Sequence, residues 1–245
     1  MSIIVNATTH PGMVRERNED CGGACSGASR FVLGGDTRRG TLDTWGDSAL
    51  VVVADGLGGH PSGDVASRIA TEHLLDAAPG DGDELVAAVH GANRSIYDAM
   101  GAAEDRREMG TTIAAVLIHR DALTVVNVGD SPVFEWDGSE LIELSVRDSL
   151  SADDDPSGWN AHVVTQTLGG GHTHRSVHPH VHRLENDRPR RLMLCTDGLT
   201  DFASQHAILH ALDGSSPATA AERLVAAALD GGGGDNVTVA VIDVD

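Results

Sequence analysis

The chain has 245 residues, 40% of them apolar, which is enough to bury the core of one large domain. Its formal net charge is −20 at pH 7, and all 17 basic residues are arginine. A surface this acidic repels nucleic acid and anionic lipid at long range, so we expect neither as a partner.

The first clear elements are a buried strand and two helices. The β-branched run SALVVVADG at 48–56 is typical of a strand covered on both faces. Residues 63–78 and 83–100 follow, with apolar residues near the spacing of amphipathic helices. This order, with both helices after one strand, departs from strict alternation of strands and helices.

Most of the remaining chain predicts strands in rapid succession. These strands are TTIAAVLI at 111–118, ALTVVNVGD at 122–130, PVFEWDG at 132–138, ELIEL at 140–144, RRLMLCTDG at 190–198 and NVTVAVIDVD at 236–245. One further helix, at 217–230, starts on a proline after Ser216. Strands and helices in blocks favour an antiparallel or mixed sheet system with helices packed outside, an α+β fold.

Aspartates stand where several predicted strands end. Asp55, Asp130 and Asp197 each follow an apolar strand, and Asp235 immediately precedes the last one. Any one of them alone favours a simple turn. Four carboxylates that converge at one sheet edge would repel one another unless a cation neutralised them, and such oxygen ligands suit Mg²⁺ or Mn²⁺. Gly56 could add its backbone carbonyl as a further ligand.

The segment VRERNED at 14–20 combines an arginine with acids. Arg15 lies four residues before Glu19, and an arginine fork matches phosphate geometry. A nearby acid could complete a second metal site, and two metals with an arginine are what phosphoryl hydrolysis needs. Taken alone, however, the segment is also typical of a solvated charge cluster.

Histidines are concentrated in the irregular part of the chain, which spans 146–186. They are His172, His174, His178, His180 and His182. On a strand, their alternation would place each set on one face, so a metal site is conceivable. Exposed histidines on a loop or an edge strand are the commoner case, and we favour that interpretation.

Two other interpretations of the short motifs fit poorly. The turn DGLGG resembles a phosphate-binding loop, but the chain lacks G-x-x-x-x-G-K-[ST] and has no lysine to serve one. Cys21 and Cys25 lack the second pair of a zinc site. With no evident secretory signal and no long apolar run, we expect reduced thiols, no membrane span and a cytoplasmic location.

Six motifs, in order, resemble those of the metal-dependent Ser/Thr protein phosphatases of bacterial type, the PPM or type 2C family. They are VRERNED at 14–20, VVVADGLGGH at 51–60, GTT at 110–112, NVGDSPVF at 127–134, LCTDGLTD at 194–201 and GGDNVTVAVI at 233–242. The resemblance covers nearly the whole chain. It implies a single domain over 1–245 with a four-layer α-β-β-α sandwich, two antiparallel sheets flanked by helix pairs.

The resemblance also implies a centre of two Mn²⁺ or Mg²⁺ ions. Asp55 would bridge both ions, Asp197 and Asp235 would hold one, and Glu19 with the Gly56 carbonyl would serve the other. The nucleophile would be a metal-bridging hydroxide that attacks phosphorus in line.

Two further roles are implied by the same resemblance. Asp130 matches the position that, with Asp197, supports a third ion in bacterial members, and Arg15 matches the arginine that grips substrate phosphate. Leu57 stands where animal members carry a histidine, and we give no such role to His60. Residues 146–168 align with the family's flap but are short and acidic.

We therefore expect a phosphatase for phosphoserine and phosphothreonine in proteins that are substrates of a Ser/Thr kinase. We also expect a monomer. One alternative is a pseudophosphatase, whose signature would be a lost metal-ligand acid, and none is lost. Another is a partner-switching phosphatase that acts on an anti-sigma-type regulator.

Overall fold

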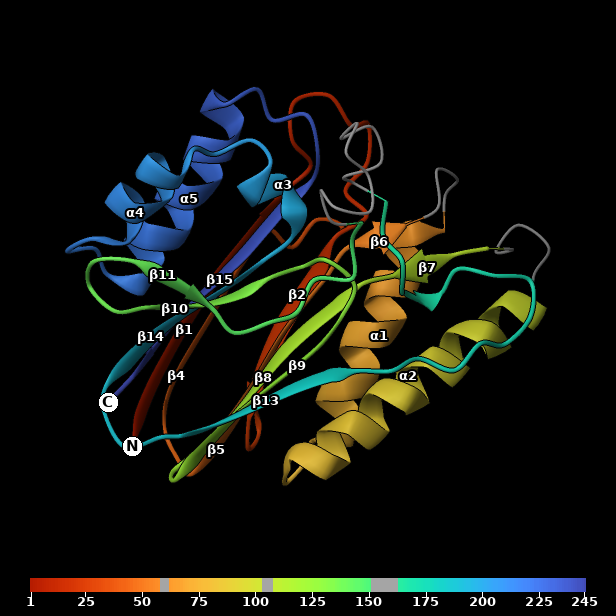
Figure 1. Ribbon diagram of the computed structural model, residues 1–245, viewed down its shortest axis with the longest axis horizontal. Helices are drawn as coiled ribbons and strands as arrows, with labels where there is room; N and C mark the ends of the chain where they lie inside the picture. Colours follow the sequence, from red (N-terminus) through yellow and green to blue (C-terminus); the bar gives the residue numbers. More distant parts are fainter. Residues whose placement is uncertain (58–61, 103–107, 151–162) are drawn as a thin grey trace.

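The computed structural model describes residues 1–57, 62–102, 108–150 and 163–245 (Figure 1). In this part of the chain two six-stranded antiparallel sheets face each other, and helices cover the outer face of each. This architecture confirms the α+β, four-layer α-β-β-α sandwich that the sequence predicts. A third, small sheet of three short strands was not predicted.

The first sheet joins the two ends of the chain. In spatial order its strands are β11 (Leu141–Glu143), β10 (Val133–Trp136), β14 (Arg190–Cys195), β15 (Val237–Val244), β1 (Ser2–His10) and β4 (Arg39–Trp45). The register of β1 on β15 runs from Ile3 opposite Val244 to His10 opposite Val237. The first and last strands therefore pair along almost their whole length.

The second sheet carries the strand that the sequence marks as buried on both faces. In spatial order its strands are β13 (His180–Glu185), β9 (Ala122–Val128), β8 (Ile113–His119), β5 (Ser48–Ala54), β2 (Cys21–Ser26) and β3 (Ser29–Leu33). The small sheet consists of β12 (Leu168–Gly169), β7 (Gly110–Thr111) and β6 (Gly56–Leu57). The predicted strand at 48–56 is thus divided between β5 and β6.

The helices fall into two groups, one on each sheet (Figure 1). The second sheet is covered by α1 (Gly63–Ala77) and α2 (Gly82–Ala102), close to the predicted ranges. The first sheet is covered by α4 (Gln205–Leu212) and α5 (Pro217–Asp230), and the short α3 (Asp197–Thr200) follows β14. Helix α5 begins as predicted, because the Ser216 hydroxyl accepts a hydrogen bond from the Thr219 N–H.

Three apolar layers hold the sandwich together. In β5, Val51 and Val53 point into the layer between the two sheets, whereas Leu50 and Val52 point toward α1 and α2. A third layer lies between the first sheet and its helices, where Val239 of β15 is buried. Because β5 is buried on both faces, its residues from Ala49 to Ala54 are all apolar, which explains the continuous apolar run.

Two further sequence-based expectations can be compared with the structure. No helix in the described ranges is long and apolar enough to cross a membrane. Cys21, Cys25 and Cys195 form no disulfide in the structure.

The layer between the sheets is expected to dominate stability. Leu192, in β14, is fully buried there, and its truncation leaves a cavity between two sheets that cannot both relax. We expect Leu192→Ala to lower the free energy of unfolding by about 2–5 kcal/mol in urea denaturation. Ile142→Ala on edge strand β11, where the residue is 41% exposed, serves as the control and should change it by less than about 1 kcal/mol. Equal losses in both variants would contradict this account of the core.

Candidate metal centre

The sheet topology brings the predicted acids to one end of the sandwich. Strands β5 and β9 both run antiparallel to β8, so Asp55 and Asp130, which follow them, lie at the same end of the second sheet. Strand β14 runs antiparallel to β15, so Asp197 after β14 and Asp235 before β15 share one end of the first sheet. The two sets interact electrostatically across the sandwich, because the charge of Asp197 acts on the Asp55 carboxyl.

The GTT motif fixes the backbone of Asp55. The Asp55 N–H donates to the Thr112 hydroxyl at 3.0 Å, and the Asp55 carbonyl accepts from the Thr111 hydroxyl at 2.8 Å and from the Thr112 N–H at 2.9 Å. Thr112 in turn shares a hydrogen bond of 2.7 Å with the Ser131 hydroxyl, next to Asp130. The two aspartate-bearing turns of the second sheet are therefore tied to each other.

Asp55 and Asp197 form a strongly coupled pair of buried carboxyl groups. Burial is the largest cause that raises the pKa of Asp55 well above its usual range, and the charges of Asp20 and Asp197 add to it. Burial also raises the pKa of Asp197, followed by the charge of Asp201. Both shifts show that ionising these two buried acids is costly, and a bound cation would lower that cost.

Asp20 belongs to this cluster, although sequence reasoning did not single it out as a site residue. It is buried, and one carboxylate oxygen accepts hydrogen bonds from the hydroxyls of Thr238 at 2.7 Å and Thr196 at 2.9 Å. Burial raises its pKa to about 7, and the charges of Asp197 and Asp235 contribute. Its place directly after Glu19, in a motif already marked as acidic, was the available signal.

Asp130 sits on a sharp turn that requires a glycine before it. Gly129 has a φ of +99°, a conformation that side chains with a Cβ rarely adopt. The Asp130 carboxyl is buried, and burial followed by the charge of Asp197 raises its pKa to about 6. The structure therefore brings Asp130 close enough to Asp197 for the two to interact electrostatically.

The loop that carries Arg15 is anchored by Asn236, the neighbour of Asp235. The Asn236 amide donates to the carbonyls of Pro11 at 2.9 Å and Arg17 at 2.8 Å, and its oxygen accepts from the Glu19 N–H at 2.8 Å. Arg15 itself pairs with Asp235, with 2.7 Å between Nη2 and Oδ2. The predicted phosphate-binding arginine is thus bonded to a predicted metal ligand.

Glu19 and Gly56 meet at the start of helix α1. A Cβ added to Gly63 would lie 2.8 Å from the Glu19 Oε2 and 2.9 Å from the Gly56 carbonyl oxygen. Burial raises the pKa of Glu19, followed by the charge of Asp64. Gly63 therefore leaves open a small cradle where a carboxylate and a carbonyl oxygen converge.

The chemistry of these donors fits a hard divalent cation. Buried carboxylate oxygens without a hydrogen-bond partner in the protein occur in Asp20, Asp64, Asp130 and Asp197, and a cation could compensate such oxygens for their burial. Within the described ranges, however, no three His, Cys, Asp or Glu side chains already surround one point. Asp235 is instead engaged by Arg15, so its carboxylate faces the guanidinium in this arrangement.

The histidines of the irregular region have separate surroundings. His172 pairs with Glu108 at 2.7 Å, and the His174 ring lies 5.0 Å from that of Tyr97. His180 is on β13, an edge strand, and pairs with Asp148 at 2.8 Å. His60 and residues 151–162 of the expected flap lie outside the described residues.

A sequence profile described as protein phosphatase 2C matches residues 37–231. The chain belongs to the protein phosphatase 2C family. This finding confirms the resemblance seen in the six sequence motifs.

Two bacterial relatives of this family differ in how much of their length matches. Serine/threonine protein phosphatase PstP of Mycobacterium tuberculosis is 33% identical over 250 residues, which cover 97% of this chain and 44% of PstP. The chain therefore spans about half the length of that relative. Serine/threonine phosphatase stp of Listeria welshimeri is 26% identical and is covered over 93% of its length.

Solved structures agree with the fold of this family member. The crystal structure of PstP/Ppp from Mycobacterium tuberculosis superposes with a TM-score of 0.79 at 32% identity, over 100% of both chains. The catalytic domain of PstP, solved in complex with two manganese ions, matches with the same TM-score and coverage. The fold of this chain is thus that of a PstP catalytic domain.

The cradle at Gly63 generates a test that does not depend on enzyme activity. We expect Gly63→Ala to weaken Mn²⁺ binding by about tenfold in calorimetry, because the new methyl group displaces the Glu19 carboxylate or the Gly56 carbonyl. Gly101→Ala, near the end of α2, is the matched control, since its Cβ would meet nothing within 4 Å. Unchanged Mn²⁺ affinity in Gly63→Ala would contradict the assignment of this cradle.

The raised pKa of Asp20 predicts a pH-dependent stability of the metal-free protein. A carboxyl that binds its proton more tightly when folded stabilises the protein below about pH 4, and this stabilisation is lost as the pH rises through about 7. In EDTA, we expect the midpoint temperature of thermal unfolding to fall as the pH rises from about 5 to about 8. Mn²⁺ should raise this midpoint temperature more at the higher pH than at the lower pH. Asp20→Asn should flatten this slope, and an equally steep slope would exclude Asp20 as its source.

Proposed function

We propose that this chain is a metal-dependent phosphatase that hydrolyses phosphoserine and phosphothreonine in proteins. The observation that carries the proposal is the convergence of acids from both sheets beside Arg15, an exposed guanidinium at the rim of the acid cluster. Buried carboxylates suit divalent cations, and an arginine fork suits a phosphate dianion. The names of the relatives, PstP and stp, support the same activity.

In this proposal the acids have distinct roles toward two ions. Asp55, whose backbone is fixed by the GTT motif, would be a ligand to both ions. Asp197 and Asp235, from the ends of β14 and β15, hold one of them. Glu19 and the Gly56 carbonyl, which meet at the Gly63 cradle, serve the other. When bound, the ions polarise the phosphoryl oxygens and lower the pKa of the attacking water.

Arg15 would bind the phosphoryl group of the substrate. Its side chain is 55% exposed, so a phosphate can reach it from solvent, whereas the backbone that carries it is fixed through Asn236. The Asp235 carboxylate that Arg15 now contacts would then turn to an ion. Arg15 thus orients the substrate, and the carboxylates position the ions against it.

Asp130 is proposed to support a third ion together with Asp197. Its buried carboxyl has one oxygen without a hydrogen-bond partner, and the charge of Asp197 acts on it. The oxygen ligands suit Mn²⁺ and Mg²⁺ alike. The two manganese ions in the PstP catalytic domain favour Mn²⁺ for the two principal sites.

The wider setting is also part of the proposal. Residues 1–245 would form one phosphatase domain that works as a monomer in the cytoplasm on substrates of a Ser/Thr kinase. The strongly acidic surface disfavours nucleic acid as a partner. A pseudophosphatase is less favoured, since every acid of the proposed centre is present, and nothing observed favours an anti-sigma-type partner over other phosphoproteins.

The decisive experiment uses hydrolysis of p-nitrophenyl phosphate and of a phosphothreonine peptide. We expect Mn²⁺-dependent turnover that EDTA abolishes, and a loss of about two orders of magnitude in Asp197→Asn, which removes one charge from the centre. Asp213→Asn, at the exposed end of α4, is the control for the same chemical change. Full activity in Asp197→Asn, or none in the unmodified protein with Mn²⁺, would refute the proposal.

A further inference from the structure

Asp148 is the point at which four parts of the chain meet. Its side chain is only 13% exposed. One carboxylate oxygen accepts hydrogen bonds from the Gly129 N–H and from the Gln166 amide, both at 2.9 Å, and the other lies 2.8 Å from Nε2 of His180. We call Asp148, Gln166 and His180 the Asp148 clamp.

The Asp148 clamp stabilises the turn at Gly129, which sets the orientation of Asp130. Gly129, directly before Asp130, donates its N–H to the Asp148 carboxylate, and its carbonyl accepts from the Asp148 N–H at 2.9 Å. Both polar groups of the Gly129 backbone are thus used by one residue. This glycine has a φ of +99°, and its carbonyl also accepts a longer hydrogen bond of 3.4 Å from the Asn127 amide. Asp148 and Asn127 therefore hold the turn together.

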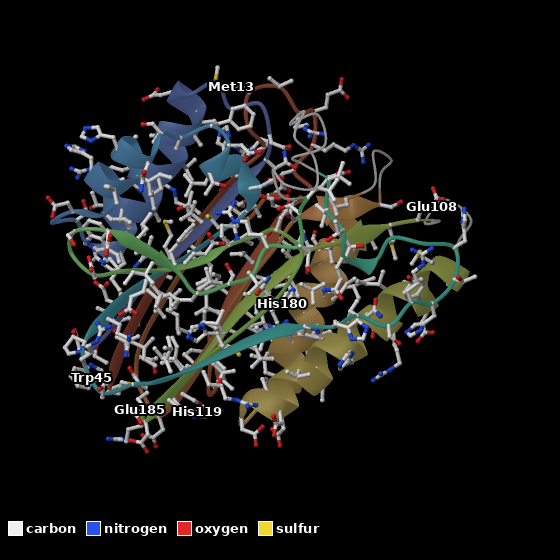
Figure 2. All side chains as sticks on the ribbon, in the orientation of Figure 1. Met13, Trp45, Glu108, His119, His180 and Glu185 are labelled. Atoms are coloured by element: carbon white, nitrogen blue, oxygen red, sulfur yellow. The ribbon has the colours of Figure 1, made fainter. Side chains whose placement is uncertain are left out.

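The same clamp joins both described ends of the expected flap segment to edge strand β13. Gln166 accepts from the His178 N–H at 2.6 Å and donates to the His178 carbonyl at 3.1 Å. The Thr165 N–H donates to the Asp148 carbonyl at 2.7 Å. His180 pairs with Asn127, near the end of β9 that precedes Asp130, whereas Glu185 lies at the other end of β13 (Figure 2).

We infer that His180 is a positioning residue for the proposed reaction: through Asp148 it fixes the Gly129 turn and so directs the Asp130 carboxylate. The inference rests on the proposed function for its catalytic consequence but on the described contacts for its structural part. Without the imidazole, one oxygen of a mostly buried carboxylate loses its partner, and the carboxylate can rotate away from the Gly129 N–H. This gives one of the five clustered histidines a role that is not metal binding.

The test compares His180→Ala with two matched variants. His182→Ala is the control, because His182 is exposed and lies two residues along the same strand. His180→Gln retains an N–H donor at a similar reach, so it should restore most of what His180→Ala loses. All three changes are on an edge strand, where the fold is expected to tolerate them.

Two measurements distinguish a residue that positions the Asp130 carboxylate from one that only stabilises the loop. In metal-free protein, hydrogen–deuterium exchange of the peptide that contains Gly129 should be faster in His180→Ala by about tenfold and unchanged in His182→Ala. In Mn²⁺ titrations, the weakest binding step should lose about tenfold in affinity in His180→Ala and recover in His180→Gln. In the assay, kcat for the phosphopeptide should fall while KM changes little.

Each contrary result has a distinct meaning. If exchange and Mn²⁺ affinity are the same in His180→Ala and His182→Ala, the inference is overturned. Faster exchange with unchanged Mn²⁺ affinity also overturns it, because the clamp would then only brace the loop. If both change as expected but the unmodified protein has no phosphatase activity, the positioning of Asp130 stands and the proposed function fails.

Discussion

The structure is organised around the repulsion among carboxylates that two facing sheets bring to one place. Asp20, Asp55 and Asp197 are all withdrawn from water, and each raises the cost of ionising another. A fold does not gather such groups for stability, since apolar side chains in the same positions would cost far less. The remainder of the molecule can be understood as the framework that holds these charges together.

That framework uses the antiparallel topology directly. The end of one strand lies beside the start of its neighbour, so acids far apart in the sequence reach the same edge. Three apolar layers supply the free energy that keeps the edge in register. Threonine and asparagine side chains, notably Thr112 and Asn236, then fix the backbone on either side of the acids.

Sequence patterns predicted the parts that are local. The run before Asp55, the two helices after it and the proline-started helix α5 all depend on residues close in sequence, and the structure confirms them. The pattern of β2, CGGACS, contains no β-branched residue, and this strand was not predicted. It is buried because β5 and β3 flank it, which is a tertiary effect.

The candidate site shows the same division. Motifs marked most of its acids, but the surroundings of Asp20 depend on Thr196 and Thr238, which are 176 and 218 residues away. The link from His180 to Asp148 spans 32 residues and has no motif at either end. Such contacts form only when the folded chain packs, so their partners cannot be inferred from a single sequence.

The ion pair between Arg15 and Asp235 has a consequence for the order of events at this centre. The Asp235 oxygen that contacts Arg15 cannot at the same moment serve a cation equally well, and the arginine cannot give both faces of its fork to a phosphate. If Asp235 holds a cation as proposed, that cation would release Arg15 for an anion. The affinities for metal and for phosphate would then be linked, each raising the other by the same factor.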